Sequence, residues 1–321
     1  MMKFKKIGKI FDPTILSEKH SFVEFAQSPQ TLVFDTFVRI FFSTRTRDEK
    51  GEYLSHIAYI DMDLDLKNIL NFSNHEIVKL GALGTYDEHG IFPFHPYATN
   101  GKIYAFLSGW NRRISVPVDT GIGLAESIDG GKTFTRLGNG PILAQSLHEP
   151  FLVGDGFVIK HENVYYMYYI FGKSWLPETE VEPVARVYKI GYATSTDLIN
   201  WKKNEGVSII ADELNKDECQ ALPTVVEHNG KYHMVFCFRE AVDFRKNPKR
   251  GYRLGYAYSD NLKDWTRADE LLELNLTYDS NEWDGEMMCY PHLFKVNNEV
   301  HLLYNGNQFG KSGFGIAKLD K

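Results

Sequence analysis

An internal repeat of 60 to 68 residues limits the folds open to this chain more than any other feature of its sequence. A strand of small residues that runs into a Ser/Asp turn recurs most clearly at 121–129, 189–197 and 253–260, with weaker copies at 55–61 and 313–317. A central alanine marks the five copies: Ala58, Ala125, Ala193, Ala257 and Ala317. Repeats at such a spacing are typical of proteins that stack one supersecondary unit per repeat.

A second marker keeps the same spacing. In each repeat a proline or glycine opens an apolar strand: Pro29, Pro93, Gly156, Pro223 and Pro291. Asn-Gly pairs at 100–101 and 229–230 then separate this strand from the next, as in tight hairpins. Each repeat therefore has room for four short strands, which is one propeller blade. We predict an all-β, five-bladed β-propeller that forms a single domain over residues 1–321. The alternative is a β-sandwich in which the two markers agree by chance.

The two ends of the chain complete this prediction. The fifth repeat stops at Lys321, before its outer strand, while residues 3–11 form a short strand-like segment with no repeat of their own. We expect this N-terminal segment to supply the missing outer strand of the last blade. Pairing the first strand with the last removes an open sheet edge and closes the ring.

Composition excludes several classes of function. The net charge is −6 and the basic residues form no long run, which argues against nucleic acid as a partner. Three cysteines without CxxC spacing, Cys219, Cys237 and Cys289, indicate reduced thiols in a cytoplasmic protein. No apolar stretch approaches the length of a membrane helix, and the N-terminus is too short and too Lys-rich for a signal peptide. We expect no membrane partner, no cofactor and no metal, because no metal-ligand spacing is visible.

Strand direction predicts where a site would lie. In an antiparallel blade, residues just before the first strand share one face with residues just after the second strand. Acidic residues precede the marker in the repeats: Glu24, Asp87, Glu88, Glu149, Glu218, Asp284 and Glu286. Arginines, aromatics and an amide follow the second strands: Arg45, Arg47, Trp110, Trp175, Arg239, Arg245 and Asn305. Such groups suit sugar faces, hydroxyls and anions. The alternatives are solvated acidic loops and structural salt bridges.

The sequence resembles the five-bladed glycoside hydrolase superfamily of families 32, 43, 68 and 130, and within it a family 43-like group of predicted glycosyl hydrolases from bacterial surface-glycan clusters. The resembling segments extend along the whole chain: 86–93, 109–111, 121–134, 148–152, 218–220, 244–245, 252–256, 283–291 and 304–307. Family 43 enzymes use an Asp base on blade one, an Asp that tunes a pKa on blade three, and a Glu acid on blade four. The resemblance implies that Glu218 is the general acid and that Glu149 or Glu286 is the base or the pKa modulator. Blade one carries Glu24 and no matching Asp, which leaves the base open.

We therefore predict a carbohydrate-active protein, a glycoside hydrolase that uses paired carboxylates in a central pocket on an anionic or modified bacterial glycan. The predicted substrate-binding residues are Asp87, Glu88, Trp110, Arg45, Trp175, Arg239, Arg245, Asp284 and Asn305. Two alternatives stay open: a non-catalytic sugar-binding propeller, and an enzyme of glycosyl transfer or phosphorolysis that uses the same pocket. The sugar, the linkage and the oligomeric state do not follow from the sequence.

Overall fold

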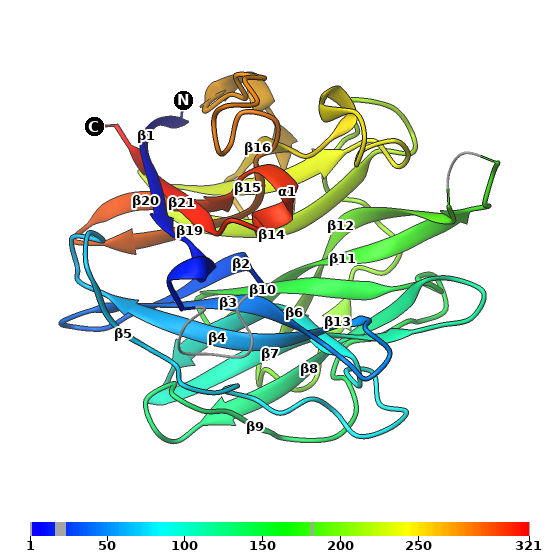
Figure 1. Cartoon of the computed structure of the whole chain (residues 1–321), viewed down its shortest axis with the longest axis horizontal. Helices are drawn as coiled ribbons and strands as arrows, with labels where there is room; N and C mark the ends of the chain where they lie inside the picture. Colours follow the sequence, from blue (N-terminus) through cyan, green and yellow to red (C-terminus); the bar gives the residue numbers. More distant parts are fainter. Residues whose placement is uncertain (1, 17–23, 181–182, 321) are drawn as a thin grey trace.

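The computed structural model describes residues 2–16, 24–180 and 183–320, and over these residues the protein is built almost wholly from β-strands. Figure 1 shows the strands as several twisted sheets. Helical structure in these ranges is limited to four short turns: η1 (Pro13–Leu16), η2 (Pro248–Arg250), η3 (Asp269–Leu271) and α1 (Asn307–Gly310). No helix in these three described ranges is long and apolar enough to cross a membrane. The all-β class predicted from the repeats is confirmed.

Four groups of antiparallel strands follow one another along the chain, and a parallel pairing of Ser55 with Gly90 joins the first two groups into one sheet. The first group contains β2 (Glu24–Val33), β3 (Val38–Arg47), β4 (Tyr53–Met62) and β5 (Ile69–Phe72). The second contains β6 (Gly90–Thr99), β7 (Lys102–Arg112), β8 (Val118–Ser127) and β9 (Thr135–Arg136). The third contains β10 (Val153–His161), β11 (Val164–Leu176), β12 (Ala185–Ser195) and β13 (Lys202–Lys203). The fourth contains β14 (Cys219–His228), β15 (Lys231–Arg239), β16 (Arg253–Ser259) and β17 (Thr266–Arg267).

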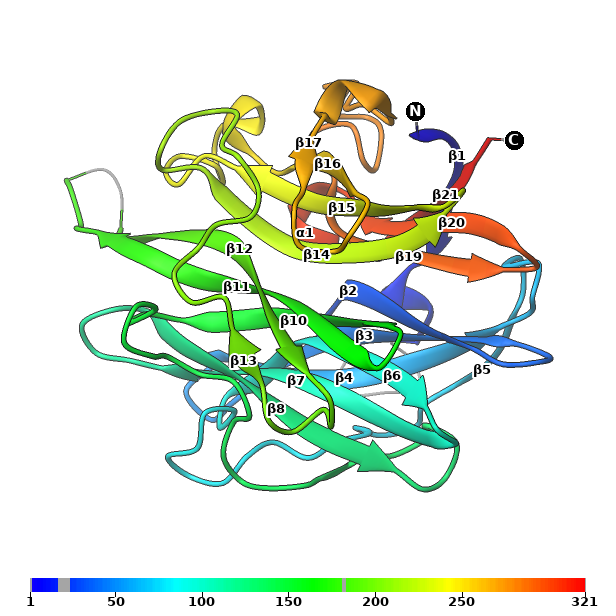
Figure 2. The same ribbon diagram turned by 180° about the vertical axis from the view of Figure 1, so that it is seen from behind.

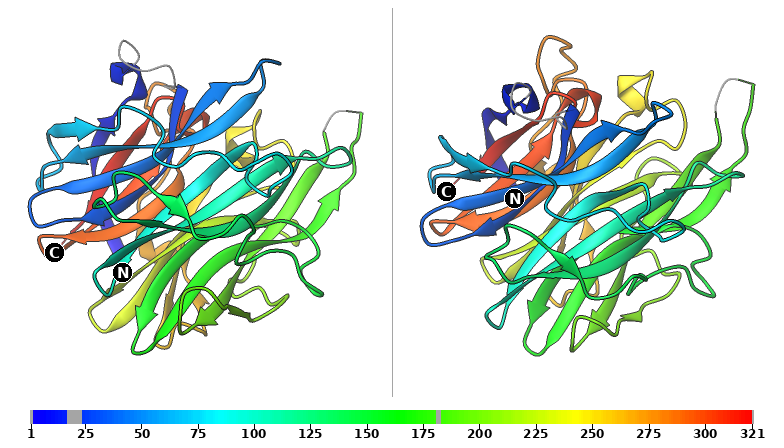
Figure 3. Two further views of the ribbon diagram at one scale, coloured as in Figure 1. Left: turned by 90° about the horizontal axis from the view of Figure 1, so that it is seen from below. Right: turned by 60° about the horizontal axis from the view of Figure 1, so that its bottom comes forward.

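The fifth group joins the two ends of the chain. It contains β19 (Cys289–Val296), β20 (Glu299–Asn305) and β21 (Phe314–Leu319), followed by β1 (Met2–Phe11) and then β18 (Leu272–Glu273). β1 lies antiparallel to β21, with Phe4 opposite Leu319 and Phe11 opposite Phe314. The termini lie side by side in Figures 1 and 3. The pairing expected for the N-terminal segment is therefore the one observed.

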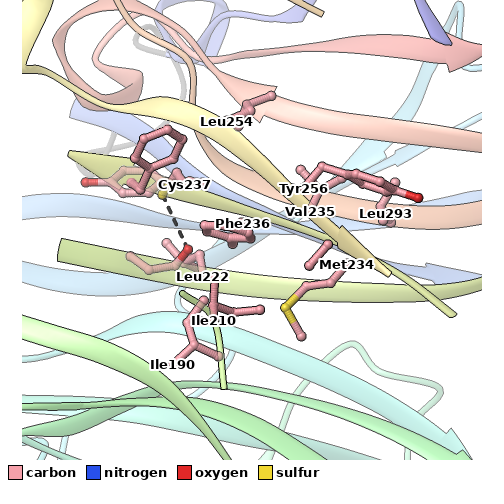
Figure 4. Packing of buried hydrophobic residues seen from close by; sticks show 14 of the residues in the cluster. Ile190, Ile210, Leu222, Met234, Val235, Phe236, Cys237, Leu254, Tyr256 and Leu293 are labelled. Carbon is pink, nitrogen blue, oxygen red and sulfur yellow. Dashed lines mark hydrogen bonds between the residues drawn. The ribbon is translucent and has the colours of Figure 1, made fainter. Parts of the chain in front are cut away.

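The first strands of the five groups adjoin one another in chain order. β2 contacts β6, β6 contacts β10, β10 contacts β14, β14 contacts β19, and β19 contacts β2. Figure 2 shows the third group lying between the first two groups and the last two. The core lies between neighbouring sheets; Figure 4 shows Ile190 and Ile210 close to Leu222, Met234 and Phe236 of the next sheet. Burial of each such side chain contributes about 1.5–3 kcal/mol.

Each first strand carries a β-bulge at the position of the proline or glycine marker. The pairing register shifts between Gln27 and Gln30, Ile91 and Phe94, Gly154 and Phe157, Ala221 and Thr224, and Cys289 and His292. The markers thus lie inside these strands, not at their starts as the sequence suggested. Proline has no N–H for the ladder and glycine has no side chain, so both suit a bulge, which bends a strand and redirects its side chains.

Candidate functional site

A central cavity of about 260 Å³ opens where the bulges meet, and all five strand groups contribute to its wall. Four of the five residues that stand directly before a marker line it: Phe92, Asp155, Leu222 and Tyr290. Three of these residues, Asp155, Leu222 and Tyr290, have positive φ angles of 57°, 48° and 55°. A non-glycine residue seldom adopts this conformation, and such residues concentrate at functional sites. The bulges therefore build the cavity.

Asp155 is the one carboxyl among the described residues that line this cavity. Its Oδ2 accepts a hydrogen bond from the backbone N–H of Leu222 at 3.1 Å, and the residue is 8% exposed. Burial raises the pKa of Asp155 to about 7, against the lowering effects of that hydrogen bond and of the Arg186 charge. A carboxyl with such a pKa is partly protonated near neutral pH, which is what a general acid requires.

Three arginines face the same cavity: Arg45, Arg186 and Arg245. None of them forms an ion pair with a carboxylate of the described ranges. The Arg45 guanidinium instead lies 4.7 Å from the ring centre of Phe25 and 5.1 Å from that of Tyr53, and its buried Nε has no hydrogen-bond partner. Guanidinium groups left without carboxylates at a cavity are suited to an anionic ligand.

Aromatic rings form much of the remaining wall, including Trp110, Tyr188 and Tyr252. The hydroxyls of Tyr188 and Tyr252 lie 2.6 Å apart. Arg239, predicted to bind substrate, does not line this cavity: it is buried, its Nη2 donates to the Tyr188 hydroxyl at 2.9 Å, and it lines the adjoining cavity. This hydrogen bond from Arg239 positions the Tyr188 hydroxyl.

None of the three predicted catalytic glutamates lines the central cavity, and two of them, Glu218 and Glu149, are held by ion pairs. Both carboxylate oxygens of Glu218 are occupied: Oε1 accepts from Arg267 at 2.6 Å and Gln220 at 2.9 Å, and Oε2 from the amides of Glu213 and Leu214. Glu149 accepts from Lys203 at 2.7 Å, the Tyr169 hydroxyl at 2.8 Å and the Gly206 amide at 2.9 Å. Both are fully buried and neither lines the central cavity. The expectation that they open onto it is corrected.

The same arrangement recurs in two further groups. Asp87 pairs with Arg136, with 2.7 Å from Nε to Oδ2, and Asp284 pairs with Lys6 at 2.9 Å. In all four pairs the acid precedes the first strand and the cation lies on the outer part of the same sheet, in β9, β13, β17 or β1. The four acids at this register therefore form repeated ion pairs, and their partners are not the arginines that follow the second strands, which the salt-bridge alternative named. Asp87 and Asp284, predicted to bind substrate, do not line the cavity.

The other predicted residues divide between the cavity and its surroundings. Trp110, Arg45 and Arg245 lie on the cavity wall, and Trp175 lines an adjoining cavity. Glu286 is half-buried in the loop before β19 and Glu88 accepts from the Gly84 amide at 2.9 Å; neither lines the central cavity. Asn305 is buried and bonds to the backbone of Ser28, Ala26 and Gly313. No group of three or more His, Cys, Asp or Glu side chains placed to hold a metal ion occurs among the described residues.

Comparison with known proteins gives full-length relatives and a relative that matches part of the chain. The uncharacterized protein Rv1502 of Mycobacterium tuberculosis is 30% identical over 324 residues, which cover 99% of this chain and 100% of that protein. A 1,2-β-oligomannan phosphorylase of Thermoanaerobacter sp. is 30% identical over 146 residues, 45% of this chain and 40% of that enzyme. No protein-family model matches the sequence.

Solved structures share the fold at low sequence identity. A glycoside hydrolase has a TM-score of 0.72 at 17% identity, and the match covers 99% of this chain and 93% of that protein. A thermostable family-43 glycoside hydrolase gives 0.62 at 16%, covering 92% and 88%. The β-1,2-mannobiose phosphorylase of Listeria innocua gives 0.66 at 13%, covering 99% and 96%. At these identities the likeness establishes the fold.

Proposed function

Since this chain belongs to the same family as the uncharacterized protein Rv1502 of M. tuberculosis and has the fold of the glycoside hydrolase superfamily, we propose that it is a carbohydrate-active enzyme that cleaves a glycosidic bond in the central cavity. One observation carries the proposal: the same cavity is lined by Asp155, a carboxyl of raised pKa, and by three arginines that form no ion pair with a described carboxylate.

We also propose that the five strand groups form one closed five-bladed propeller over residues 1–321. The ring of contacts from β2 through β6, β10, β14 and β19 back to β2 supports this arrangement, as does the place of β1 in the last group. A channel through such a ring meets all five first strands, which agrees with a cavity walled by residues of every group.

In the proposed reaction Asp155 is the general acid. Its proton passes to the glycosidic oxygen as the bond from that oxygen to the anomeric carbon breaks. Hydrolysis by the usual route needs a second carboxylate to activate water, and the described wall of the cavity offers none. Inorganic phosphate needs no such base, because it is already a nucleophile at neutral pH.

We therefore propose that the acceptor is inorganic phosphate held by Arg45, Arg186 and Arg245. A phosphate oxygen forms the new bond to the anomeric carbon, the departing sugar leaves with the proton of Asp155, and the proton lost by the phosphate restores the acid. The products are a sugar phosphate and a shortened sugar. The partial likeness to a 1,2-β-oligomannan phosphorylase agrees with this choice of acceptor and makes β-1,2-linked mannosides the first substrates to test.

The test is a turnover assay with and without inorganic phosphate. β-1,2-Mannobiose, arabinosides, xylosides, fucosides and anionic glycosides would be incubated with the protein, and sugar phosphate and free sugar would be separated and counted. We expect sugar phosphate only when phosphate is present. Release of free sugar without phosphate would contradict the phosphate acceptor and favour hydrolysis. Binding in calorimetry without any product would overturn the enzymatic proposal and favour a sugar-binding protein.

A further inference from the structure

A second cavity adjoins the central one beside the end of the β11–β12 hairpin. Its volume is about 430 Å³, and it lies between this hairpin and the segment that links β15 to β16. We call it the hairpin cavity; its wall includes Val118, Trp175, Arg186, Phe244, Arg245 and Lys246. β11 and β12 are among the longest strands of the protein, and Figure 1 shows their hairpin projecting from the body of the molecule.

The hairpin cavity shares part of its wall with the proposed site. Val118, Arg186 and Arg245 line both cavities. The two cavities therefore adjoin each other at these three side chains. The junction is lined by side chains from β8, β12 and the β15–β16 segment, so three strand groups meet there.

Trp175 is the aromatic surface that this cavity offers to a ligand. It stands opposite Arg186 across the hairpin, so the two side chains lie on the same face. Trp175 also lines a third hollow, together with Pro150 and Phe151. In the described ranges no other ring stacks on Trp175 and no cation lies over it, in contrast to Phe244, whose ring has Arg239 at 3.6 Å and Arg245 at 4.9 Å.

The charges around Trp175 are unbalanced. Arg186, Arg245 and Lys246 form no ion pair with a described carboxylate, and Asp243 is the one acidic residue of the described wall. These cations carry hydrogen-bond donors and no acceptors, so they suit hydroxyl and ring oxygens. The wall thus combines a free aromatic face with several donors, which is the pairing that a sugar ring requires.

We propose that the hairpin cavity is a second sugar-binding subsite, in which one sugar of the substrate stacks on Trp175 while the bond to its neighbour lies beside Asp155. The inference rests on the proposed function. It implies that the substrate is an oligosaccharide of at least two linked sugars and that Trp175 determines chain-length preference. Trp175 acts here on binding, since it does not line the cavity that holds Asp155.

The test compares Trp175→Ala with Trp175→Phe, which keeps an aromatic face, and with Ile128→Ala as a control. Ile128 is fully exposed and follows β8 at the end opposite to Val118, far along the strand from the site. The probes are β-1,2-mannotriose, arabinotriose and xylotriose, with β-mannosyl fluoride as a donor of one sugar, because its leaving group has no ring to occupy the subsite. Calorimetry gives Kd, and steady-state assays give KM and kcat.

We expect Trp175→Ala to raise Kd and KM for the bound trisaccharide about tenfold, which corresponds to about 1.4 kcal/mol, with kcat little changed. Trp175→Phe should recover most of this loss, and neither variant should affect the single-sugar donor. An unchanged Kd in Trp175→Ala, an equal loss on the single-sugar donor, or no trisaccharide binding by the native protein would each overturn the subsite. Turnover that persists in any of these cases leaves the proposed function intact. Conversely, Trp175-dependent binding without turnover contradicts only the proposed function.

Discussion

Asp155 and Glu218 are both buried carboxyls, and their surroundings separate their roles. Four donors satisfy the oxygens of Glu218, which leaves none free for a substrate. One oxygen of Asp155 accepts a hydrogen bond from a backbone N–H, and the residue lines the central cavity. A group that must exchange a proton with a ligand needs an oxygen free to face that ligand, and of the two residues only Asp155 has one.

Asp155→Asn tests the proton donor. The amide is close in size and keeps an oxygen for the Leu222 amide, so binding of mannobiose should stay within a few-fold. Turnover should fall by about 10²–10⁴, the usual contribution of a positioned proton donor. Substrates with good leaving groups, which need no protonation, should be affected less. Equal losses on good and poor leaving groups would show that Asp155 does not donate the proton.

The raised pKa of Asp155 also sets a pH dependence. The general acid must be protonated in the free enzyme, and its pKa is about 7. We expect kcat/KM to fall as the pH rises through about 7, and this fall should be absent from the residual activity of Asp155→Asn. Protein stability should change in the same direction, because the folded-state pKa lies above the ordinary aspartate value of 3.8: the folded state binds the proton more tightly, and stability is lost as the pH rises toward 7. A flat profile between pH 6 and 8 would contradict the assignment.

At the scale of the strands and loops, each of the four repeated ion pairs links the loop before the first strand of a sheet to the outer part of that sheet. Glu218 joins the loop before β14 to β17 through Arg267, and both side chains are almost wholly buried. Removing one partner of a buried pair leaves the other charge uncompensated, which is more costly than removing both.

Glu218→Gln should therefore act on stability. We expect the free energy of unfolding to fall by about 3–5 kcal/mol in denaturant titrations, and the double variant Glu218→Gln, Arg267→Met to recover part of the loss. Asp260→Asn, which removes the exposed partner of Lys231, is the matched control and should cause no measurable change. If Glu218→Gln keeps the native stability and loses turnover only on substrates with poor leaving groups, Glu218 is the general acid that the family resemblance implies.

The repeats made the strand pattern and the place of the N-terminal strand predictable, because both follow from spacing in the chain. The acids were predictable as a set, but their role was not. A carboxylate before a strand gives the same sequence pattern whether it faces a ligand or pairs with a distant lysine, as Glu149 does with Lys203, 54 residues later in the chain. Asp155 was missed because it stands inside a strand, directly before the marker Gly156. Its signal was nonetheless present, since Phe92, Leu222 and Tyr290 stand at the same place relative to their own markers and line the same cavity.

At the scale of the whole molecule, the charges of the protein and of its cavity have opposite signs. The chain carries a net charge of −6, while the central and hairpin cavities together present Arg45, Arg186, Arg245 and Lys246 without described carboxylate partners. A local positive field inside a negative protein concentrates anions at one place and repels them elsewhere. This distribution agrees with the proposed reaction, in which phosphate is held next to a neutral sugar.

The joint between the two ends of the chain can be tested through Phe11. This residue lies on β1, is 2% exposed, and packs against Phe42 of β3 at 5.1 Å and Phe314 of β21 at 5.2 Å between ring centres. One side chain thus joins the first strand group to the last. Phe11→Ala should lower the free energy of unfolding by about 3–5 kcal/mol, the usual cost of a cavity of this size.

In a closed ring this loss should appear as one cooperative transition, because opening one joint exposes two sheet edges and the cores on both sides. Ile7→Ala is the control: Ile7 lies on the same strand but is 59% exposed, so its loss should change stability by less than about 0.5 kcal/mol. The measurement is denaturant unfolding followed by both tryptophan fluorescence and far-ultraviolet circular dichroism. If the Phe11→Ala transitions separate, with the last strand group melting before the rest, the joint is a local contact and the sheets do not depend on a closed ring for their stability.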